Sequence, residues 1–595
     1  MIDPHSFANT DAFLATHIAL DLRADFERKR LVGHVDLTLD RVRAEAREVV
    51  LDTRALHISK VELLEASPVG LDYELGESDK LLGAPLRISL PANLAGESIK
   101  LRIAYETSPE ASGLQWLTPA QTAGKKQPFL FSQSQAIHAR SWIPLQDTPQ
   151  VRVTYEARIR TPRQLLAVMS AANDPGTPRD GDYHFEMPQA VPSYLIALSI
   201  CDLQFKSLGP RTGVYAEPAQ LEAAAWEFAD TEAMLVTCEK MFGPYQWGRY
   251  DLLILPPSFM WGGMENPRLS FITPTVIAGD RSLVSLIAHE LAHSWSGNLV
   301  TNASWDSAWL NEGFTTYLER RIVEVIYGRD RAAMEDALGM QSLQRDMDAL
   351  TKGGDEALTK LAGDLKGRDP DDGFSDVAYE KGRFFVGFLE SRLGRDELDE
   401  FLRGYFSRFA FQSVSTDDFR AYLGEHVLNA PNAKLTLAEV NAWIDQPGLP
   451  STVVMPQSNA FEVVDAAREE WLQGRAQASA LRTSSWTTHQ WLHFLDNLPP
   501  PTSAARLGEL DAAFKLTESK IAHSWLKNAI RADYAPAYPR LEAYLTSIGR
   551  RKLVKDLYEE LAKTPQGKAR AQAIYRQARA MYQVPLVEQL DEVLR

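Results

Sequence analysis

Apolar and polar residues alternate along four segments near the start of the chain, residues 17–26, 34–42, 98–107 and 151–160. A period of two is typical of strands that bury one face and expose the other. Clusters of Gly, Pro, Asn and Asp lie between these segments and indicate turns. The pattern therefore predicts a β domain over residues 1–204.

The spacing of apolar residues lengthens to that of helices from about Leu221 onward. Residues 217–243 are predicted to form one helix that ends at Gly243, because glycine commonly terminates helices. More helices follow, interrupted by one strand-like segment at residues 268–276. We expect residues 205–445 to form a second domain in which helices predominate.

A break in the pattern separates this region from the rest of the chain. Residues 446–457 contain three prolines and few helix signals, which predicts a linker. Residues 458–595 show short amphipathic helices with turns between them, which predicts a helical layer of the solenoid type, although no strict repeat is visible. The fold class predicted for the whole chain is multidomain α+β.

Composition narrows the class of function and the compartment. The 595 residues include 63 basic and 79 acidic side chains, a net charge of −16, which speaks against a nucleic-acid-binding protein because such proteins need a basic surface. The two cysteines, Cys201 and Cys238, allow no disulfide framework and fit a reducing compartment. No apolar run is long enough to span a membrane, and the N-terminus lacks a basic and apolar leader. We expect a cytoplasmic protein, with a signal peptide trimmed before residue 1 as the alternative.

Candidate metal ligands lie in residues 283–300, which contain the sequence His-Glu-Leu-Ala-His. Residues four apart share one face of a helix, so His289 and His293 can reach the same ion. The helix is predicted to end at Gly297. A catalytic zinc site usually has three protein ligands and an open position for water. Glu312, nineteen residues after His293, is the candidate third ligand.

Glu290 and a second pair of histidines help to separate a catalytic motif from a chance one. Glu290 lies beside the candidate ligands and is placed to take a proton from an attacking water. His489 and His493 have the same spacing, but Gln490 stands where the catalytic carboxylate would be. We interpret the second pair as packing or surface histidines. The first pair predicts a zinc site with one ion per chain.

The sequence around the first motif resembles the zinc-binding signature of the peptidase family M1 aminopeptidases, in the branch of leukotriene A(4) hydrolase and aminopeptidase B. The similarity covers most of the chain, and the similar segments follow one another in the order found in the family. They are residues 131–149, 261–267, the metal segment with WLNEGFTTYLE after it, 377–385 and 567–570. The resemblance implies an N-terminal β saddle, a thermolysin-like zinc catalytic domain and a C-terminal α-helical superhelical domain. These correspond to the three zones of the hydrophobic pattern.

The resemblance also implies roles for residues near the metal. Gly262 and Gly263 allow backbone to approach a ligand closely, and after Met264 the carboxylate of Glu265 supplies charge. Standing alone, such a motif would be an ordinary turn. The family pattern implies that Glu265 binds the α-ammonium of a substrate, with Gln135 as its partner. It also implies that Tyr379 donates a hydrogen bond to the tetrahedral oxyanion.

Four further positions concern the two ends of a substrate. The resemblance implies that Asp371 shapes the pocket for the first side chain and could attract Arg or Lys there. It implies that Lys568 and Arg570 hold the free carboxylate, which would favour short peptides. Without the resemblance, Asp371 would be interpreted as an ordinary loop carboxylate, and Lys568 and Arg570 as part of a solvated helix face. Phe374 departs from the family's epoxide hydrolase, which has a second tyrosine at this position.

The function predicted from the sequence is a zinc-dependent aminopeptidase that hydrolyses the N-terminal residue from short peptides. Its partners would be peptides with a free N-terminus, and neither nucleic acid nor a membrane span is expected. One alternative is a bifunctional enzyme that also opens leukotriene A(4)-type epoxides, which Phe374 disfavours. Another is a non-enzymatic scaffold, which would have no reason to keep the ligands, Glu290, Glu265 and Tyr379 together. The sequence does not indicate the preferred first residue or the oligomeric state.

Overall fold

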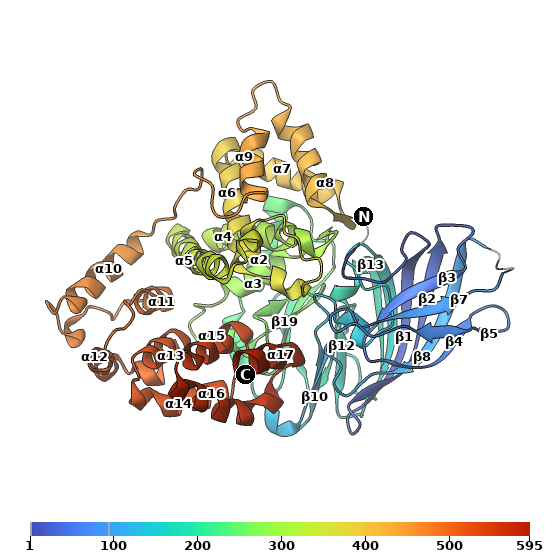
Figure 1. Ribbon diagram of the computed structural model, residues 1–595, viewed down its shortest axis with the longest axis horizontal. Coiled ribbons are helices and arrows are strands. Elements are labelled where there is room, and N and C mark those ends of the chain that lie inside the picture. Colours follow the sequence, from blue (N-terminus) through green and yellow to red (C-terminus); the bar gives the residue numbers. More distant parts are fainter. Residues whose placement is uncertain (1–2, 93, 95, 520) are drawn as a thin grey trace.

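The computed structural model of the protein describes residues 3–92, 94, 96–519 and 521–595. Strands of the first third of the chain, a mixed central region and a set of C-terminal helices follow one another and meet near the centre of the molecule (Figure 1). This arrangement confirms the predicted α+β fold class with its three parts. Among the described residues, no helix is long and apolar enough to cross a membrane.

The N-terminal β domain is built on a seven-stranded sheet with the strand order β13-β11-β1-β2-β8-β4-β5. The four segments predicted as strands are all confirmed, as β1, β2, β8 and β11. Smaller sheets with the orders β3-β7-β6 and β12-β14-β10-β9 complete the domain. The strands are β1 Phe13–Asp25, β2 Arg30–Arg41, β3 Glu48–Thr53, β4 His57–Leu63, β5 Val69–Gly70, β6 Tyr73–Leu75, β7 Ala84–Ser89, β8 Ser98–Glu106, β9 Leu114–Leu117, β10 Phe129–Ser132, β11 Arg152–Arg160, β12 Leu166–Met169, β13 Asp182–Pro192 and β14 Leu198–Cys201.

The central region combines a five-stranded sheet of order β15-β16-β17-β19-β18 with helices. Its strands are β15 Gln204–Ser207, β16 Thr212–Ala216, β17 Tyr250–Ile254, β18 Gly263–Met264, β19 Leu269–Ile272, β20 Val300–Asn302 and β21 Gln412–Val414. Its helices are α1 Leu221–Glu227, α2 Thr231–Phe242, α3 Ser285–Ala292, α4 Trp309–Tyr327, α5 Arg329–Gly353, α6 Gly382–Leu393, α7 Arg395–Arg408, α8 Thr416–Leu423 and α9 Leu437–Ile444.

Three sequence predictions for this region need correction. The single helix predicted over 217–243 is two helices, α1 and α2, although Gly243 does end the second with a φ of 102°. The strand-like segment at 268–276 is confirmed as β19, but other strands accompany it. The metal-bearing helix α3 ends at Ala292 and not at Gly297. The chain turns early because the Ser296 hydroxyl donates to the carbonyl oxygens of Leu310 and Asn311 at 2.9 and 3.0 Å, at the start of α4.

The C-terminal region consists of helices and has a hydrophobic core of its own, whereas one continuous core runs through the two preceding regions. Its helices are α10 Asn459–Leu472, α11 Thr488–Asp496, α12 Ala504–Phe514, α13 Ala522–Arg531, α14 Tyr538–Leu545, α15 Arg551–Ala562, α16 Pro565–Ala578 and α17 Val584–Val593. The predicted linker, residues 446–457, contains no helix or strand.

Backbone hydrogen bonds attach the C-terminal helices to the central region just before α15. The N–H of Gly549 donates to the carbonyl of Pro257 at 2.8 Å, and that of Arg551 donates to Met260 at 2.7 Å. A side chain on Gly549 would collide with Ser258, whose carbonyl oxygen lies 2.6 Å from the position of a Cβ atom. This contact places the start of α15 directly beside the segment that leads into Gly262.

Candidate active site

The three predicted metal ligands converge in the interior, between α3 and α4. Nε2 of His289 lies 3.3 Å from Oε2 of Glu312, and Nε2 of His293 lies 3.5 Å from the same oxygen. Two ligand atoms bound to zinc at 2.0–2.1 Å with tetrahedral angles stand about 3.3 Å apart. The separations therefore fit a zinc ion, and these three residues form one of two groups of possible metal ligands among the described residues.

Hydrogen bonds on the far side of each imidazole fix the orientation of the candidate ligands. Nδ1 of His289 lies 3.0 Å from Oε2 of Glu319, and Nδ1 of His293 lies 3.1 Å from the carbonyl oxygen of Ser296. Both partners accept hydrogen bonds, so Nδ1 carries the proton and Nε2 keeps a free lone pair for a metal. Glu319 was not predicted, although its place on α4 two turns after Glu312 could have indicated it.

The electrostatics of the site call for a cation. Burial and neighbouring carboxylates raise the pKa of Glu290 well above its usual range and that of Glu265 to about 8. Burial lowers the pKa of His293 to about 4. Oε2 of Glu290 and Oε2 of Glu312 are buried without a hydrogen-bond partner in the described part of the chain. A divalent ion bound to Glu312 would satisfy its free oxygen and compensate the negative charge of both carboxylates, so the residues present fit zinc.

Glu290 projects from α3 toward the β18 segment. A side chain at Gly263 would place its Cβ atom 2.1 Å from Oε1 of Glu290, so only glycine leaves room for the carboxylate. The position of Glu290 beside the candidate ligands is the one predicted for a general base.

Glu265 lies beside the candidate metal ligands and is linked to the predicted partner. Nε2 of Gln135 donates to Oε1 of Glu265 at 3.2 Å, and the side-chain amide of Asn298 donates to its backbone carbonyl at 2.7 Å. Ligand atoms of Glu265, Glu290 and His293 lie within 4.8 Å of one another. The structure thus brings the predicted amine-binding pair next to the metal ligands, with Asn298 as a support that the sequence did not indicate.

Tyr379 faces the metal ligands from a short π-helix, Val377–Lys381. Its ring stacks on His289 at 5.9 Å between centroids and 21° between planes. Burial and the carboxylates of Glu312 and Glu265 raise the pKa of Tyr379 well above its usual range. The phenol therefore stays protonated and can donate a hydrogen bond.

Asp371 and Phe374 lie on the neighbouring loop. Oδ1 of Asp371 accepts the backbone N–H of Ala136 at 3.2 Å, one residue beyond Gln135. Phe374 is buried against Trp261 and Trp305, with ring centroids 6.1 and 5.7 Å away. The carboxylate of Asp371 is therefore already hydrogen-bonded to the backbone, and Phe374 forms a cluster of aromatic rings with Trp261 and Trp305.

Lys568 and Arg570 are not brought to the site. Both lie on α16, on the side of α15 that faces away from α3 in Figure 1. The guanidinium of Arg570 stacks on the ring of Tyr538, 3.8 Å from its centroid. The Arg570 guanidinium is therefore engaged within the C-terminal helices, and the substrate-binding role implied for the basic pair stays a prediction.

Arg550, which was not predicted, lies beside the segment that carries Gly262. Its Nη2 lies 2.7 Å from where a Cβ atom of Gly262 would be, and its Nη1 donates to the hydroxyl of Thr275 at 3.2 Å. No carboxylate within the described ranges lies within 4.0 Å of its guanidinium, and Nε has no partner. Sequence reasoning missed Arg550 because basic residues are frequent throughout the C-terminal helices.

The fold and this group of buried side chains define a metal-dependent hydrolase. The histidine pair with its third carboxylate can hold a metal ion, Glu290 can move a proton, and the remaining carboxylate and arginine can bind the ends of a charged substrate.

Comparisons with known proteins place the chain within that class. Three family models match it in order: "Peptidase M1 N-terminal domain" at residues 14–195, "Peptidase family M1 domain" at 226–443 and "Leukotriene A4 hydrolase, C-terminal" at 486–594. Leukotriene A-4 hydrolase of Xenopus laevis is 39% identical over 94% of this chain and 94% of its own length. Leucine aminopeptidase 2 of Yarrowia lipolytica is 37% identical over 94% of this chain and 88% of its own.

Solved structures agree with the family models. The structure of yeast LTA4 hydrolase in complex with bestatin matches with a TM-score of 0.90 and 32% identity, covering 100% of this chain and 97% of that chain. The protein belongs to peptidase family M1, which implies zinc as the metal.

Proposed function

We propose that the protein is a zinc aminopeptidase with one zinc ion per chain, acting on short peptides with a free N-terminus. The observation that carries the proposal is the position of Glu265. Its buried carboxylate lies within one residue-length of the metal ligands and is held by Gln135. A substrate ammonium bound there puts the first peptide bond at the metal, so only the first residue is removed.

His289, His293 and Glu312 would hold the zinc ion, which when bound supplies a Lewis acid for the scissile carbonyl and an activated water. Glu290 takes a proton from the attacking water and delivers it to the leaving amine. Tyr379 donates a hydrogen bond to the oxyanion of the tetrahedral intermediate. Changing Tyr379 to Phe should accordingly lower kcat more than it raises KM.

Arg550 binds the free carboxylate of a short peptide in this proposal. It lies next to Gly262, and no carboxylate of the described chain neutralises it at close range. Gripping both ends favours di- and tripeptides over long chains. Arg550→Met should therefore raise KM for tripeptides more than for aminoacyl amides, which lack a carboxylate, whereas Arg570→Met should affect neither.

The test of the proposed function uses aminoacyl amides and their N-acetylated forms, with and without chelator. We expect cleavage of the free-amine substrates only, loss of activity with a strong chelator, recovery with zinc, and about one zinc per chain by elemental analysis. Glu265→Gln should reduce kcat/KM for free-amine substrates by about 100-fold or more because a charged partner of the ammonium is lost. Internal cleavage of blocked peptides would point to an endopeptidase, and absence of zinc and cleavage to a scaffold.

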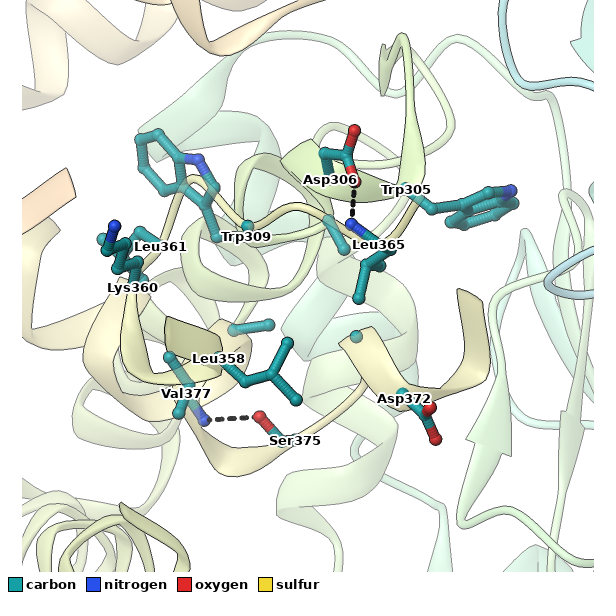
Figure 2. A pocket seen from close by; sticks show the side chains of 14 residues that line it. Trp305, Asp306, Trp309, Leu358, Lys360, Leu361, Leu365, Asp372, Ser375 and Val377 are labelled. Atoms are coloured by element: carbon teal, nitrogen blue, oxygen red, sulfur yellow. Dashed lines mark hydrogen bonds between the residues drawn. The ribbon is translucent and has the colours of Figure 1, made fainter. Parts of the chain in front are cut away.

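An epoxide hydrolase activity remains the alternative because of the relatives, but the surroundings of Phe374 disfavour it. The cavity beside Trp305 is small, with a volume of about 30 Å³, and its wall includes Leu361 and Val377 (Figure 2). A lipid chain would need a long apolar channel there. Incubation with leukotriene A(4) should give no dihydroxy product above spontaneous hydrolysis, and turnover comparable to the peptidase rate would establish the alternative.

A further inference from the structure

Asp371 stands next to the place where the first side chain of a peptide would lie. It is buried, and its Oδ1 accepts the N–H of Ala136, while Gln135 on the other side of that peptide unit contacts Glu265. If Glu265 binds the ammonium, the side chain of the first residue points toward Asp371. A free carboxylate in that position would select Arg or Lys.

The carboxylate of Asp371 is not free, because His138 faces it. Nε2 of His138 lies 3.6 Å from Oδ2 of Asp371. Nδ1 of the same ring lies 3.1 Å from Nη1 of Arg54, which can only donate, so Nδ1 accepts and Nε2 carries the proton. The N–H of the imidazole is thereby directed at Asp371.

A second positive group comes from the C-terminal region. Arg551 follows Arg550, and its Cζ lies 4.4 Å from the centroid of the Trp261 ring. No carboxylate in the parts of the chain that the structure describes lies within 4.0 Å of the Arg551 guanidinium. Although burial opposes it, the N–H of His138 that faces the carboxylate, together with the positive charge of Arg551, lowers the pKa of Asp371.

These contacts make the pocket unfavourable for a cation and favourable for an apolar group. A substrate Arg or Lys would meet a carboxylate that is already compensated and a second cation at the Trp261 ring. An uncharged apolar side chain would pack on Trp261 and Phe374, whose ring centroids are 6.1 Å apart, without burying a charge.

We propose that Arg551 is a specificity-determining residue whose positive charge, beside the N–H of His138, offsets the charge of Asp371 and makes the enzyme select uncharged apolar N-terminal residues over Arg and Lys. The proposal rests on the proposed aminopeptidase function, because the pocket is located from the amine site at Glu265.

The test compares leucinamide-type and argininamide-type substrates with the zinc-loaded full-length protein. The parent should have the higher kcat/KM for leucine. Arg551→Met keeps an unbranched apolar side chain next to Trp261 but removes the charge, and should lower the leucine-to-arginine ratio of kcat/KM about tenfold or more. Arg551→Lys retains the charge and should leave the ratio near that of the parent. Adding Asp371→Asn to Arg551→Met should abolish the gain for arginine.

Arg506→Met is the matched control, because Arg506 stacks on Trp471 at 4.1 Å in the C-terminal helices without approaching the site. It should not change the ratio. The proposal would be overturned if the parent had a kcat/KM for the arginine substrate equal to or above that for the leucine substrate. It would also be overturned if Arg551→Met left the ratio of the two kcat/KM values unchanged.

Calorimetric binding of leucinamide and argininamide to the Glu290→Gln protein separates this proposal from the proposed function. One outcome is that the parent cleaves neither amide, yet leucinamide binds more tightly than argininamide and Arg551→Met narrows this difference in affinity. In that case the aminopeptidase function fails and the selectivity proposal stands. If neither amide binds, the selectivity proposal fails as well.

Discussion

The two histidine pairs of this chain have the same spacing but entirely different surroundings. His289 and His293 on α3 direct their Nε2 atoms at one oxygen of Glu312. On α11, His489 lies 3.5 Å from Glu335, whereas His493 lies 2.8 Å from Asp465 and stacks on Phe461. The two histidines of the second pair therefore contact different carboxylates. Helical spacing brings two rings to one face, and only the opposing element decides whether they share a ligand.

The two pairs are nevertheless connected through one buried arginine. Arg320 contacts Glu319, the partner of His289, and its Nη1 lies 3.6 Å from Oε2 of Glu335, the partner of His489. The carboxylates and the guanidinium compensate one another in the interior, where an unpaired charge would be costly. The same kind of carboxylate contact therefore orients a metal ligand on one side and attaches the C-terminal helices on the other.

Removing one histidine from each pair should produce the largest contrast. His293→Ala deletes a metal ligand, so zinc content should fall to near zero after dialysis and activity should be undetectable. His493→Ala should retain zinc and activity but lower the melting temperature, since it loses the ring stacking and the hydrogen bond to Asp465. Elemental analysis, amide hydrolysis and calorimetry measure the three quantities. Zinc loss in His493→Ala would show that the second pair is also a metal site.

Glu290→Gln should remove turnover without removing the metal. Glutamine cannot accept a proton from water, and general-base catalysis contributes about 100- to 10,000-fold, so kcat should fall by that factor at unchanged zinc content. The variant gives the first histidine pair a glutamine at the position where the second pair already has Gln490. Near-normal kcat would exclude Glu290 as the base.

Glu319→Gln should have a smaller effect, on metal affinity. The amide oxygen can still accept from Nδ1 of His289, but the negative charge that strengthens the ligand is lost, and such changes cost about 10- to 100-fold in metal affinity or activity. Competition with a chelator of known affinity measures the change. Glu335→Gln is the matched control, because it contacts the same Arg320 but no metal ligand. Equal loss of zinc in both variants would mean that the arginine network and not the Glu319 contact holds His289.

The sequence predicted what depends on local pattern and missed what depends on distant contacts. Strands such as β1 and β11 follow from alternation, and the convergence of the three candidate metal ligands follows from helical spacing with a carboxylate on the next helix. The early end of α3 depends on Ser296 bonding to α4, and no local signal records that contact. Arg550 reaches the site only because Gly549 packs on Ser258, so a basic residue there looks like any other in the C-terminal helices.

The smallest expected effect tests whether the sequence motif alone suffices. Gln490→Glu converts the second pair into a complete His-Glu-x-x-His sequence on α11. Glutamate can keep the capping interaction in which Oε1 accepts from the N–H of Thr487 at 3.0 Å. The hydrogen bond that Nε2 of Gln490 donates to the carbonyl of Ala460, also at 3.0 Å, is lost. One such hydrogen bond contributes about 1 kcal/mol, so the variant should be slightly less stable. It should bind no second zinc, because Nε2 of His489 faces Glu335 while Nε2 of His493 faces Asp465, and no common third ligand joins them. Zinc analysis after dialysis should still give about one ion per chain. A second ion of comparable affinity would show that the motif creates the site and that the opposing helix only stabilises it.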